Sequence, residues 1–301
     1  MGKYRLILWV LIAAMIACIV TGVLILRNNA APKIVEIRTE EDLLQLLDKS
    51  TSPARVRAAL TEDITLNTVF EPCSFVGTID GCGHTVTIGN NQINKLFDSV
   101  AEGSTVINLI IKGTFGFSDN EDAYGICDSN CGSIENCCVL ANCCASLRAF
   151  GICRDNKGSI SNCAVLGKSF QTQSGKYVCL QILQDNTGIV ENSFYRKDES
   201  TPSENAVGTG LEGSECTDGS LAAKLDDFAR SHSGYVSWKT GPDGLPLLFT
   251  DIPSVAASVF SIGTETLWLL CMIVVLALLM IYTIYYFDVR KKYYGQKEAE
   301  A

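Results

Sequence analysis

Cysteine is the residue type with the most chemistry to offer in this chain. The sequence has 14 cysteines, and twelve remain once Cys18 and Cys271 are set aside because they fall in long apolar runs. Four of the twelve occupy matching positions of a repeated phrase: Cys127 with Cys153, and Cys137 with Cys163. Neighbouring copies of such a phrase stack about 4.8 Å apart, a separation that a disulfide tolerates. Disulfides and stacked, buried thiols both remain open as interpretations.

A metal centre is a second chemistry that cysteine supports. Four cysteines gather between positions 137 and 144, and thiolates select zinc or iron–sulfur clusters. The chain has no Cys-x-x-Cys pair, however, and its only histidines are His84 and His232. Adjacent cysteines in a strand also point to opposite faces. We therefore expect no metal and no other cofactor.

Acidic and basic side chains offer a third chemistry, the cleavage of sugar chains. The residues that could be grouped for it are Asp128, Glu135, Asp155, Arg148, Arg154 and Glu191. No two of them are marked by their spacing as a general acid and a general base. Asp80 and His84 are another possible pair, but in a glycine-rich corner both can satisfy local backbone groups instead. We therefore expect no catalytic residues.

A repeated phrase is the strongest structural pattern in the chain. The segment GICDSNCGSIENC of residues 125–137 returns 26 residues later, at 151–163, as GICRDNKGSISNC. Looser copies on either side place four asparagines in one register: Asn108, Asn136, Asn162 and Asn192. A repeat of this length predicts a solenoid of stacked coils. One asparagine per coil can form a structural ladder in which each amide bonds to the next.

The elements that position these residues are short strands separated by turns. The coils are clearest over residues 96–195, where each contains a short apolar stretch, a polar turn with glycine and a further strand. The segments 168–176 and 196–215 are polar or rich in Ser, Thr, Glu and Gly, so we expect both to project as loops. Such loops are favoured places for ligand contact.

Two helices are expected at the ends of the solenoid. Thr39, with Asp42 three residues later, resembles a capping box and opens a helix with an apolar face. A second helix begins after 217 or 218 and runs to about Ser231. Both helices are expected to cover open ends of the core, which would otherwise present unpaired strand edges to solvent.

Two apolar runs, 6–26 and 262–287, are each long enough to cross roughly 30 Å of hydrocarbon as a helix. The first run is long for a signal peptide, which favours an uncleaved anchor. Basic residues precede the first run and follow the second, so residues 1–5 and the tail 288–301 are expected in the cytoplasm. The domain between them, 33–252, is then expected outside the cell membrane.

The repeats also resemble those of a known family. Besides the phrases at 125–137 and 151–163, the glycine-rich segment 75–84 and the segment 238–248 are similar to parts of GLUG-repeat proteins. These are bacterial surface proteins of adhesin-like and immunoglobulin A protease-type polypeptides. The resemblance covers roughly 34–249 and implies a right-handed parallel β-helix outside the membrane. The family carries no single reaction.

These patterns predict an all-β solenoid, a right-handed parallel β-helix with short capping helices, flanked by two transmembrane α-helices. The predicted function is a double-pass membrane protein that displays its exterior β-helix as a non-catalytic binding or adhesion module for glycan or protein. An accessory or scaffold subunit of a membrane complex is one alternative, and a polysaccharide lyase or hydrolase is another. The net charge of −9 argues against a nucleic acid partner.

Overall fold

The structure is a computed structural model, and the chain divides into two compact units. One unit is Pro32–Ala256, and the other joins Met1–Ala31 with Ala257–Ala301. The structure describes residues 34–52, 55–90, 92–115, 123–143, 149–167, 182–197, 207–249, 282–287 and 289–290. In the second unit the described residues are therefore only 282–287 and 289–290, which are helical.

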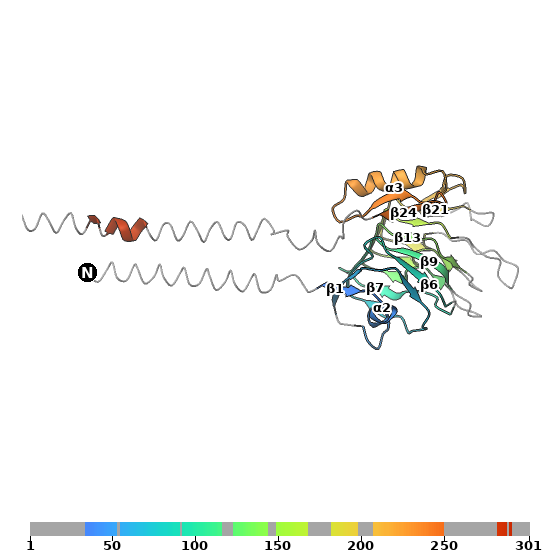
Figure 1. Ribbon diagram of the computed structural model, residues 1–301, viewed down its shortest axis with the longest axis horizontal. Coiled ribbons are helices and arrows are strands. Elements are labelled where there is room, and N and C mark those ends of the chain that lie inside the picture. The colour runs from blue at the N-terminus through green and yellow to red at the C-terminus, as the bar shows by residue number, and fades with distance from the viewer. Residues whose placement is uncertain are drawn as a thin grey trace, which may run out of the picture. The chain divides into compact units, whose positions relative to one another are not determined.

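Three parallel sheets form the body of Pro32–Ala256 (Figure 1). Sheet A has seven strands: β1 (Ile34–Ile37), β2 (Val56–Leu60), β5 (Gly77–Asp80), β8 (Thr105–Ile107), β12 (Ser133–Glu135), β17 (Ser159–Ser161) and β20 (Ile189–Glu191). Sheet B has five: β4 (Ser74–Phe75), β7 (Phe97–Val100), β11 (Cys127–Asn130), β16 (Asp155–Asn156) and β19 (Asp185–Asn186). Sheet C has eight: β3 (Ile64–Leu66), β6 (Thr85–Ile88), β9 (Ile110–Phe115), β13 (Cys138–Val139), β14 (Asn142–Cys143), β18 (Ala164–Val165), β21 (Phe194–Arg196) and β22 (Thr209–Leu211).

The chain visits the sheets in the order B, A, C, and each such circuit is one coil. Five coils contribute a strand to every sheet, beginning with β4, β5 and β6 and ending with β19, β20 and β21. A small parallel pair, β10 (Ala123–Tyr124) with β15 (Ala149–Phe150), joins two of these coils. The predicted all-β parallel solenoid is confirmed.

Alternation of apolar and polar residues explains why these short segments become strands. In sheet A the middle residue of each strand stacks on its counterpart in the next coil, while the residues beside it face outward. The inward column is Ile79, Val106, Ile134, Ile160 and Val190. Because each short strand buries little by itself, the stacking of coils is what creates a continuous core.

The helix α2 (Glu40–Leu47) closes one end of this core, as predicted. Its N-terminus has the full capping box, in which Asp42 N donates to Thr39 Oγ1 at 3.2 Å and Thr39 N donates to Asp42 Oδ2 at 3.0 Å. Three leucines on its apolar face are buried in the interior core: Leu43, Leu46 and Leu47. The strands β1 and β2 are neighbours in sheet A, and the chain between them forms α2. In this turn, which precedes the five complete coils, the helix stands where the other coils have strands of sheets C and B.

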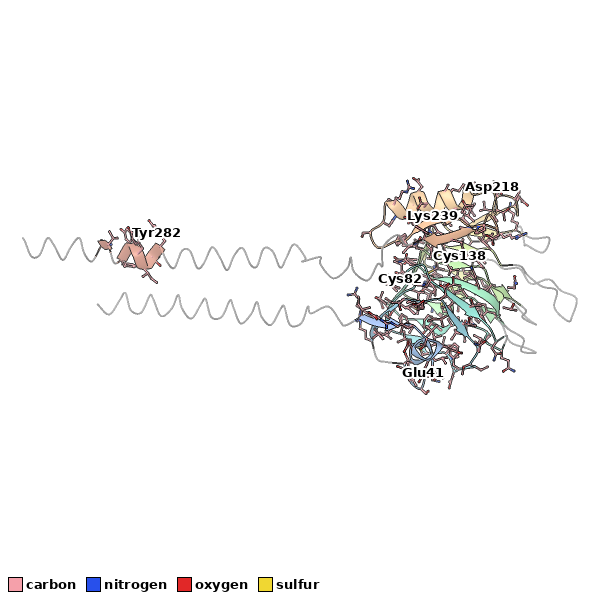
Figure 2. All side chains as sticks on the ribbon, viewed as in Figure 1. Glu41, Cys82, Cys138, Asp218, Lys239 and Tyr282 are labelled. Atoms are coloured by element: carbon pink, nitrogen blue, oxygen red, sulfur yellow. The ribbon has the colours of Figure 1, made fainter. Side chains whose placement is uncertain are left out.

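The helix α3 (Ser220–Arg230) does not cover the other end, and that prediction is wrong. With the antiparallel hairpin β23 (Ser237–Thr240) and β24 (Pro246–Phe249), it covers the outer face of sheet C; we call Ser220–Phe249 the lateral cover. The apolar residues of sheet C beneath it come from four successive coils: Ile110, Cys138, Ala164 and Phe194. Figure 2 labels Cys138 in the solenoid and Lys239 on β23 above it. At these positions sheet C is therefore buried on both faces.

The far end of the solenoid has strands with free edges among the described residues. There, β19 and β20 each pair with one neighbour only, and Ile189 is 66% exposed. The expectation that 196–215 projects as a loop is partly wrong, because β22 adds to the edge of β21. The other expected loop, 168–176, lies outside the described residues.

The predicted transmembrane helices require a correction. No helix among the described residues is both long and apolar enough to span a membrane. The structure thus supports an all-β solenoid with short helices and does not support the two flanking transmembrane helices of the predicted fold class. Of the predicted spans, 6–26 lies outside the described residues, and 262–287 is described only over 282–287.

Candidate functional site

The four asparagines of the repeat form a ladder at the corner between sheets A and C. Nδ2 of each donates to Oδ1 of its predecessor: Asn136 to Asn108 at 2.7 Å, Asn162 to Asn136 at 2.6 Å, and Asn192 to Asn162 at 2.6 Å. All four have positive φ, between 41° and 56°, which asparagine tolerates better than most residues. The first three are completely buried.

The same ladder holds the lateral cover in place. Trp238 Nε1 donates to Asn136 Oδ1 at 2.6 Å, and Val236 N donates to Asn108 Oδ1 at 3.0 Å. In return, Asn162 Nδ2 donates to the carbonyl oxygen of Leu225 at 3.1 Å. The ladder therefore serves the fold, and both side-chain polar atoms of Asn136 are already hydrogen-bonded within it.

A second ladder, which the sequence analysis missed, lies between sheets B and A. Asn130 Nδ2 donates to Asn156 Oδ1 at 2.8 Å, and Asn156 Nδ2 donates to Asn186 Oδ1 at 2.9 Å. The signal was present, because Asn130 and Asn156 stand at the same position of the repeated phrase. This ladder is also structural.

The repeated cysteines are free thiols in the interior. Cys127 and Cys153 stack on the sheet B side, and Cys137 and Cys163 follow the first ladder. All four are at most 1% exposed. Burial raises the pKa of Cys127 and of Cys137 well above the ordinary value, and the stacked partner thiol raises each further. A thiol that stays protonated is a poor nucleophile and a poor metal ligand, so Cys127 and Cys137 act as packing groups. Cys153 and Cys163 are buried in the same core.

Native alkylation distinguishes stacked thiols from disulfides. We expect iodoacetamide to label Cys131, which is half-exposed, and to leave Cys127, Cys137, Cys153 and Cys163 unlabelled until the chain is denatured. Peptide mass spectrometry after sequential native and denatured labelling measures both. Cross-linked peptides joining Cys127 to Cys153, or Cys137 to Cys163, would contradict this account.

The structure separates the other residues considered for metal binding or acid–base chemistry. His84 Nδ1 lies 3.2 Å from Asp63 Oδ1 rather than against Asp80. Asp80 Oδ1 instead accepts from Asn108 Nδ2 at 2.9 Å and so ends the first ladder. Among the described residues, no group of three His, Cys, Asp or Glu side chains is placed to hold a metal ion.

The acidic and basic residues suggested for sugar chemistry divide between two sheets. Asp128, Asp155 and Arg154 come together on sheet B. Glu135 and Glu191 belong to sheet A, on strands β12 and β20. The remaining residue of that group, Arg148, lies outside the described residues.

Five side chains on consecutive coils form what we call the charged row. They are Lys95, Asp98, Asp128, Arg154 and Asp155. Lys95 Nζ lies 2.9 Å from Asp98 Oδ1 and 4.0 Å from Asp128 Oδ2. Arg154 Nε lies 3.3 Å from Asp128 Oδ1, and Arg154 Nη2 lies 3.0 Å from Asp155 Oδ2. Each cation thus holds two carboxylates, and both cations share Asp128.

The register of sheet B creates this row. Strands β7, β11 and β16 pair so that Asp98, Asp128 and Arg154 lie level on neighbouring coils. Because side chains alternate along a strand, Asp128 faces outward while Cys127 faces the core. The row is partly sunk into the surface, since the side chains of Lys95, Asp128 and Arg154 are 16%, 23% and 35% exposed. Burial raises the pKa of Asp128, although the nearby Arg154 and Lys95 oppose the increase.

Aromatic rings lie beside the charged row. Tyr124 and Phe150 stack with ring centroids 6.0 Å apart and planes inclined by 10°. Lys95 Nζ lies 6.0 Å from the centroid of the Tyr124 ring, so the ring pair and the row adjoin. Tyr124 is buried, whereas Phe150 is half-buried and presents part of its ring.

A shallow cleft continues the row toward the first coil. It has a volume of about 440 Å³ and is lined by Lys49, Glu71, Pro72, Ser74, Lys95 and Asp98. Two of these lining residues, Lys49 and Glu71, form an ion pair of 2.8 Å. Lys95, Asp98, Tyr124 and Phe150 were not predicted from the sequence, because none of them stands in the clear repeat phrase. Only the stacking of coils brings them to Asp128.

Comparisons with known proteins give little beyond this geometry. No protein-family model matches the chain, and no curated protein matches it significantly. Among solved structures, the chain is similar to a Bacteroides ovatus protein described as a candidate immunoglobulin A1 protease. The identity is 15%, the match covers 73% of this chain and 93% of that chain, and the TM-score is 0.35. At these values the similarity says nothing about what this chain does.

Proposed function

We propose that Pro32–Ala256 is a non-catalytic binding module whose ligand is a glycan, held along the charged row of sheet B. The main observation in support is that charged, aromatic and cleft-lining residues from several coils lie together on one side of the solenoid. Sugars are bound by planar polar groups that engage their hydroxyls and by aromatic rings that contact their apolar faces.

The ion pairs of the row favour binding over catalysis. A general acid and a general base need environments that drive their pKa values apart. In the row, Asp98, Asp128 and Asp155 each lie within 4.0 Å of Lys95 or Arg154. The cations therefore hold these carboxylates in fixed positions, which suits the binding of a ligand of defined shape.

The distribution of apolar residues favours a glycan over a protein ligand. Protein interfaces centre on apolar and aromatic side chains. Among the described residues of this unit, the large apolar side chains that are exposed are Val35, Val69, Ile189 and Phe249. None of them belongs to sheet B. The resemblance of the repeats to those of GLUG-repeat adhesins supports a place for the module outside the cell.

An array of immobilised glycans, probed with the purified full-length chain, tests this proposal. Phe150→Ala removes the half-buried ring beside the row, and we expect it to weaken binding about 10-fold, since an aromatic contact contributes about 1 kcal/mol or more. Phe249→Ala is the matched control, because that ring is exposed on β24 of the lateral cover. No glycan bound by the wild type, equal losses in both variants, or release of reducing or unsaturated sugar ends would overturn the proposal.

A further inference from the structure

We propose that a cleft at the ends of strands β3 and β6, beside β9, is a second carbohydrate site, which binds an uncharged sugar. The cleft has a volume of about 570 Å³, and we call it the glycine cleft. Its lining residues are Asn67, Ile88, Gly89, Asn90, Gly113 and Thr114. None of them belongs to the charged row, so the two sites can be tested separately.

A glycine between two polar residues makes the hollow. The register of β3, β6 and β9 places Asn67, Gly89 and Thr114 at the same level, with Gly89 between the other two. Gly89 does not have a positive φ, so its backbone conformation does not require glycine. A Cβ at this position would overlap Oδ1 of Asn67 and fill the space beside it. The missing side chain is therefore what leaves the cleft open.

Asn67 is presented to this hollow by a backbone that is held on both sides. Its N–H donates to Oε1 of Glu40 at 2.6 Å, and the N–H of Thr68 donates to the same oxygen at 2.7 Å. Its carbonyl oxygen accepts from Nδ2 of Asn90 at 2.8 Å. The side-chain amide of Asn67 is exposed and has no hydrogen-bond partner among the described residues. A free amide on a fixed backbone is prepared for a ligand, because binding then costs less ordering.

The polar groups of the glycine cleft match the hydroxyls of a sugar. The hydroxyl of Thr114, like the amide of Asn67, has no partner within the described part of the chain. Amides and hydroxyls both donate and accept hydrogen bonds, as sugar hydroxyls do. Of the described residues that line the cleft, none is Lys, Arg, Asp or Glu. A uronic acid or an amino sugar would lose the hydration of its charge here without gaining an ion pair, which favours an uncharged sugar.

The strands around the glycine cleft favour a sugar over a peptide. An extended peptide binds by adding to a strand whose backbone groups are unpaired. Strand β6 is paired on both sides, with β3 and β9, and β9 is paired with β6 and β13. Past the end of β3, the N–H groups of Asn67 and Thr68 are occupied by Glu40. Side chains, rather than backbone groups, are thus what this cleft offers a ligand.

Saturation-transfer NMR on the full-length chain tests this site, because the method detects the weak binding expected of an open cleft. The probes are maltose, cellobiose and lactose, together with an uncharged peptide, N-acetyl-trialanine amide. We expect the disaccharides to bind the wild type and the peptide not to bind.

Two substitutions in the cleft and one outside it complete the test, all made in Phe150→Ala, which weakens the charged row. Asn67→Ala removes the free amide and should weaken disaccharide binding about 5-fold or more. Gly89→Ala should have a similar effect, because its Cβ displaces the flexible end of the Asn67 side chain and fills part of the cleft. Asn186→Ala is the matched control, since Asn186 is an exposed asparagine on β19 of sheet B.

The outcomes separate this site from the charged row. Disaccharide binding that remains in Phe150→Ala and falls when Asn67→Ala or Gly89→Ala is added would support the inference. Binding that is lost in Phe150→Ala, or that neither cleft substitution changes, would overturn the inference and leave the charged row as the glycan site. Preference for the peptide, or no disaccharide binding by the wild type, would also overturn the inference, whereas the charged row is tested by the array of longer glycans.

Discussion

Replacing Asn136 with alanine should lower the free energy of unfolding by about 4 kcal/mol or more, because it leaves several buried groups without partners. Asn136 donates to Asn108 Oδ1 and to the carbonyl oxygen of Val236, and it accepts from Asn162 and Trp238. The change therefore interrupts the ladder and detaches the lateral cover. Urea denaturation followed by circular dichroism and Trp fluorescence measures the loss.

Two controls separate the hydrogen bonds of Asn136 from its backbone conformation. Its φ is 52°, where alanine is strained by about 1–2 kcal/mol. Asn136→Gly removes that strain, so it should recover only this part of the loss. Asn192→Ala lies at the half-buried end of the ladder and breaks a single bond to Asn162, so it should cost clearly less. Equal costs for Asn136→Ala and Asn192→Ala would show that the ladder does not act as described.

Replacing Gly77 with alanine should prevent the first coils from stacking. Gly77 has a φ of 134°, and a Cβ there would overlap the backbone carbonyl oxygen of Val56 on the neighbouring strand. Backbone atoms in a paired strand cannot move aside cheaply, so we expect a loss of more than about 4 kcal/mol or a failure to fold. The yield of soluble chain and its urea midpoint report the effect.

Gly103→Ala is the matched control for this close approach. Gly103 also has a positive φ, 70°, but a Cβ there meets no atom within 4 Å. It should therefore cost only the conformational strain, about 1–2 kcal/mol. If both substitutions had the same effect, strain rather than the contact with Val56 would explain the role of Gly77.

The solenoid and its first ladder were predictable because they depend on identical residues at equal intervals. A repeated phrase with asparagine at a constant position forces equivalent residues of neighbouring coils to stack, whatever the rest of the coil contains. The N-terminal helix was predictable too, since Thr39 and Asp42 act locally and need no tertiary information. The second ladder, through Asn130 and Asn156, obeyed the same rule and was overlooked.

The position of α3 and the charged row could not be predicted in this way. The apolar face of α3, with Leu221 and Leu225, shows that the helix is buried against something, but an end of the core and the outer face of sheet C satisfy that need equally. The 26-residue repeat aligns Arg154 with Asp128, but Lys95 lies outside the repeated phrase and joins Asp128 only through the stacking of coils. The spacing of the repeat therefore predicts the Asp128–Arg154 contact but not the contact with Lys95.

Hydrogen–deuterium exchange of the full-length chain, with and without an oligosaccharide that binds it, tests the central claim most directly. If the glycan lies along the charged row, added protection outside the glycine cleft should be confined to peptides containing Lys95, Asp128, Phe150 and Arg154. Peptides of the lateral cover should exchange unchanged, because they lie on sheet C. Protection of Ser220–Arg230 instead of sheet B would contradict this account.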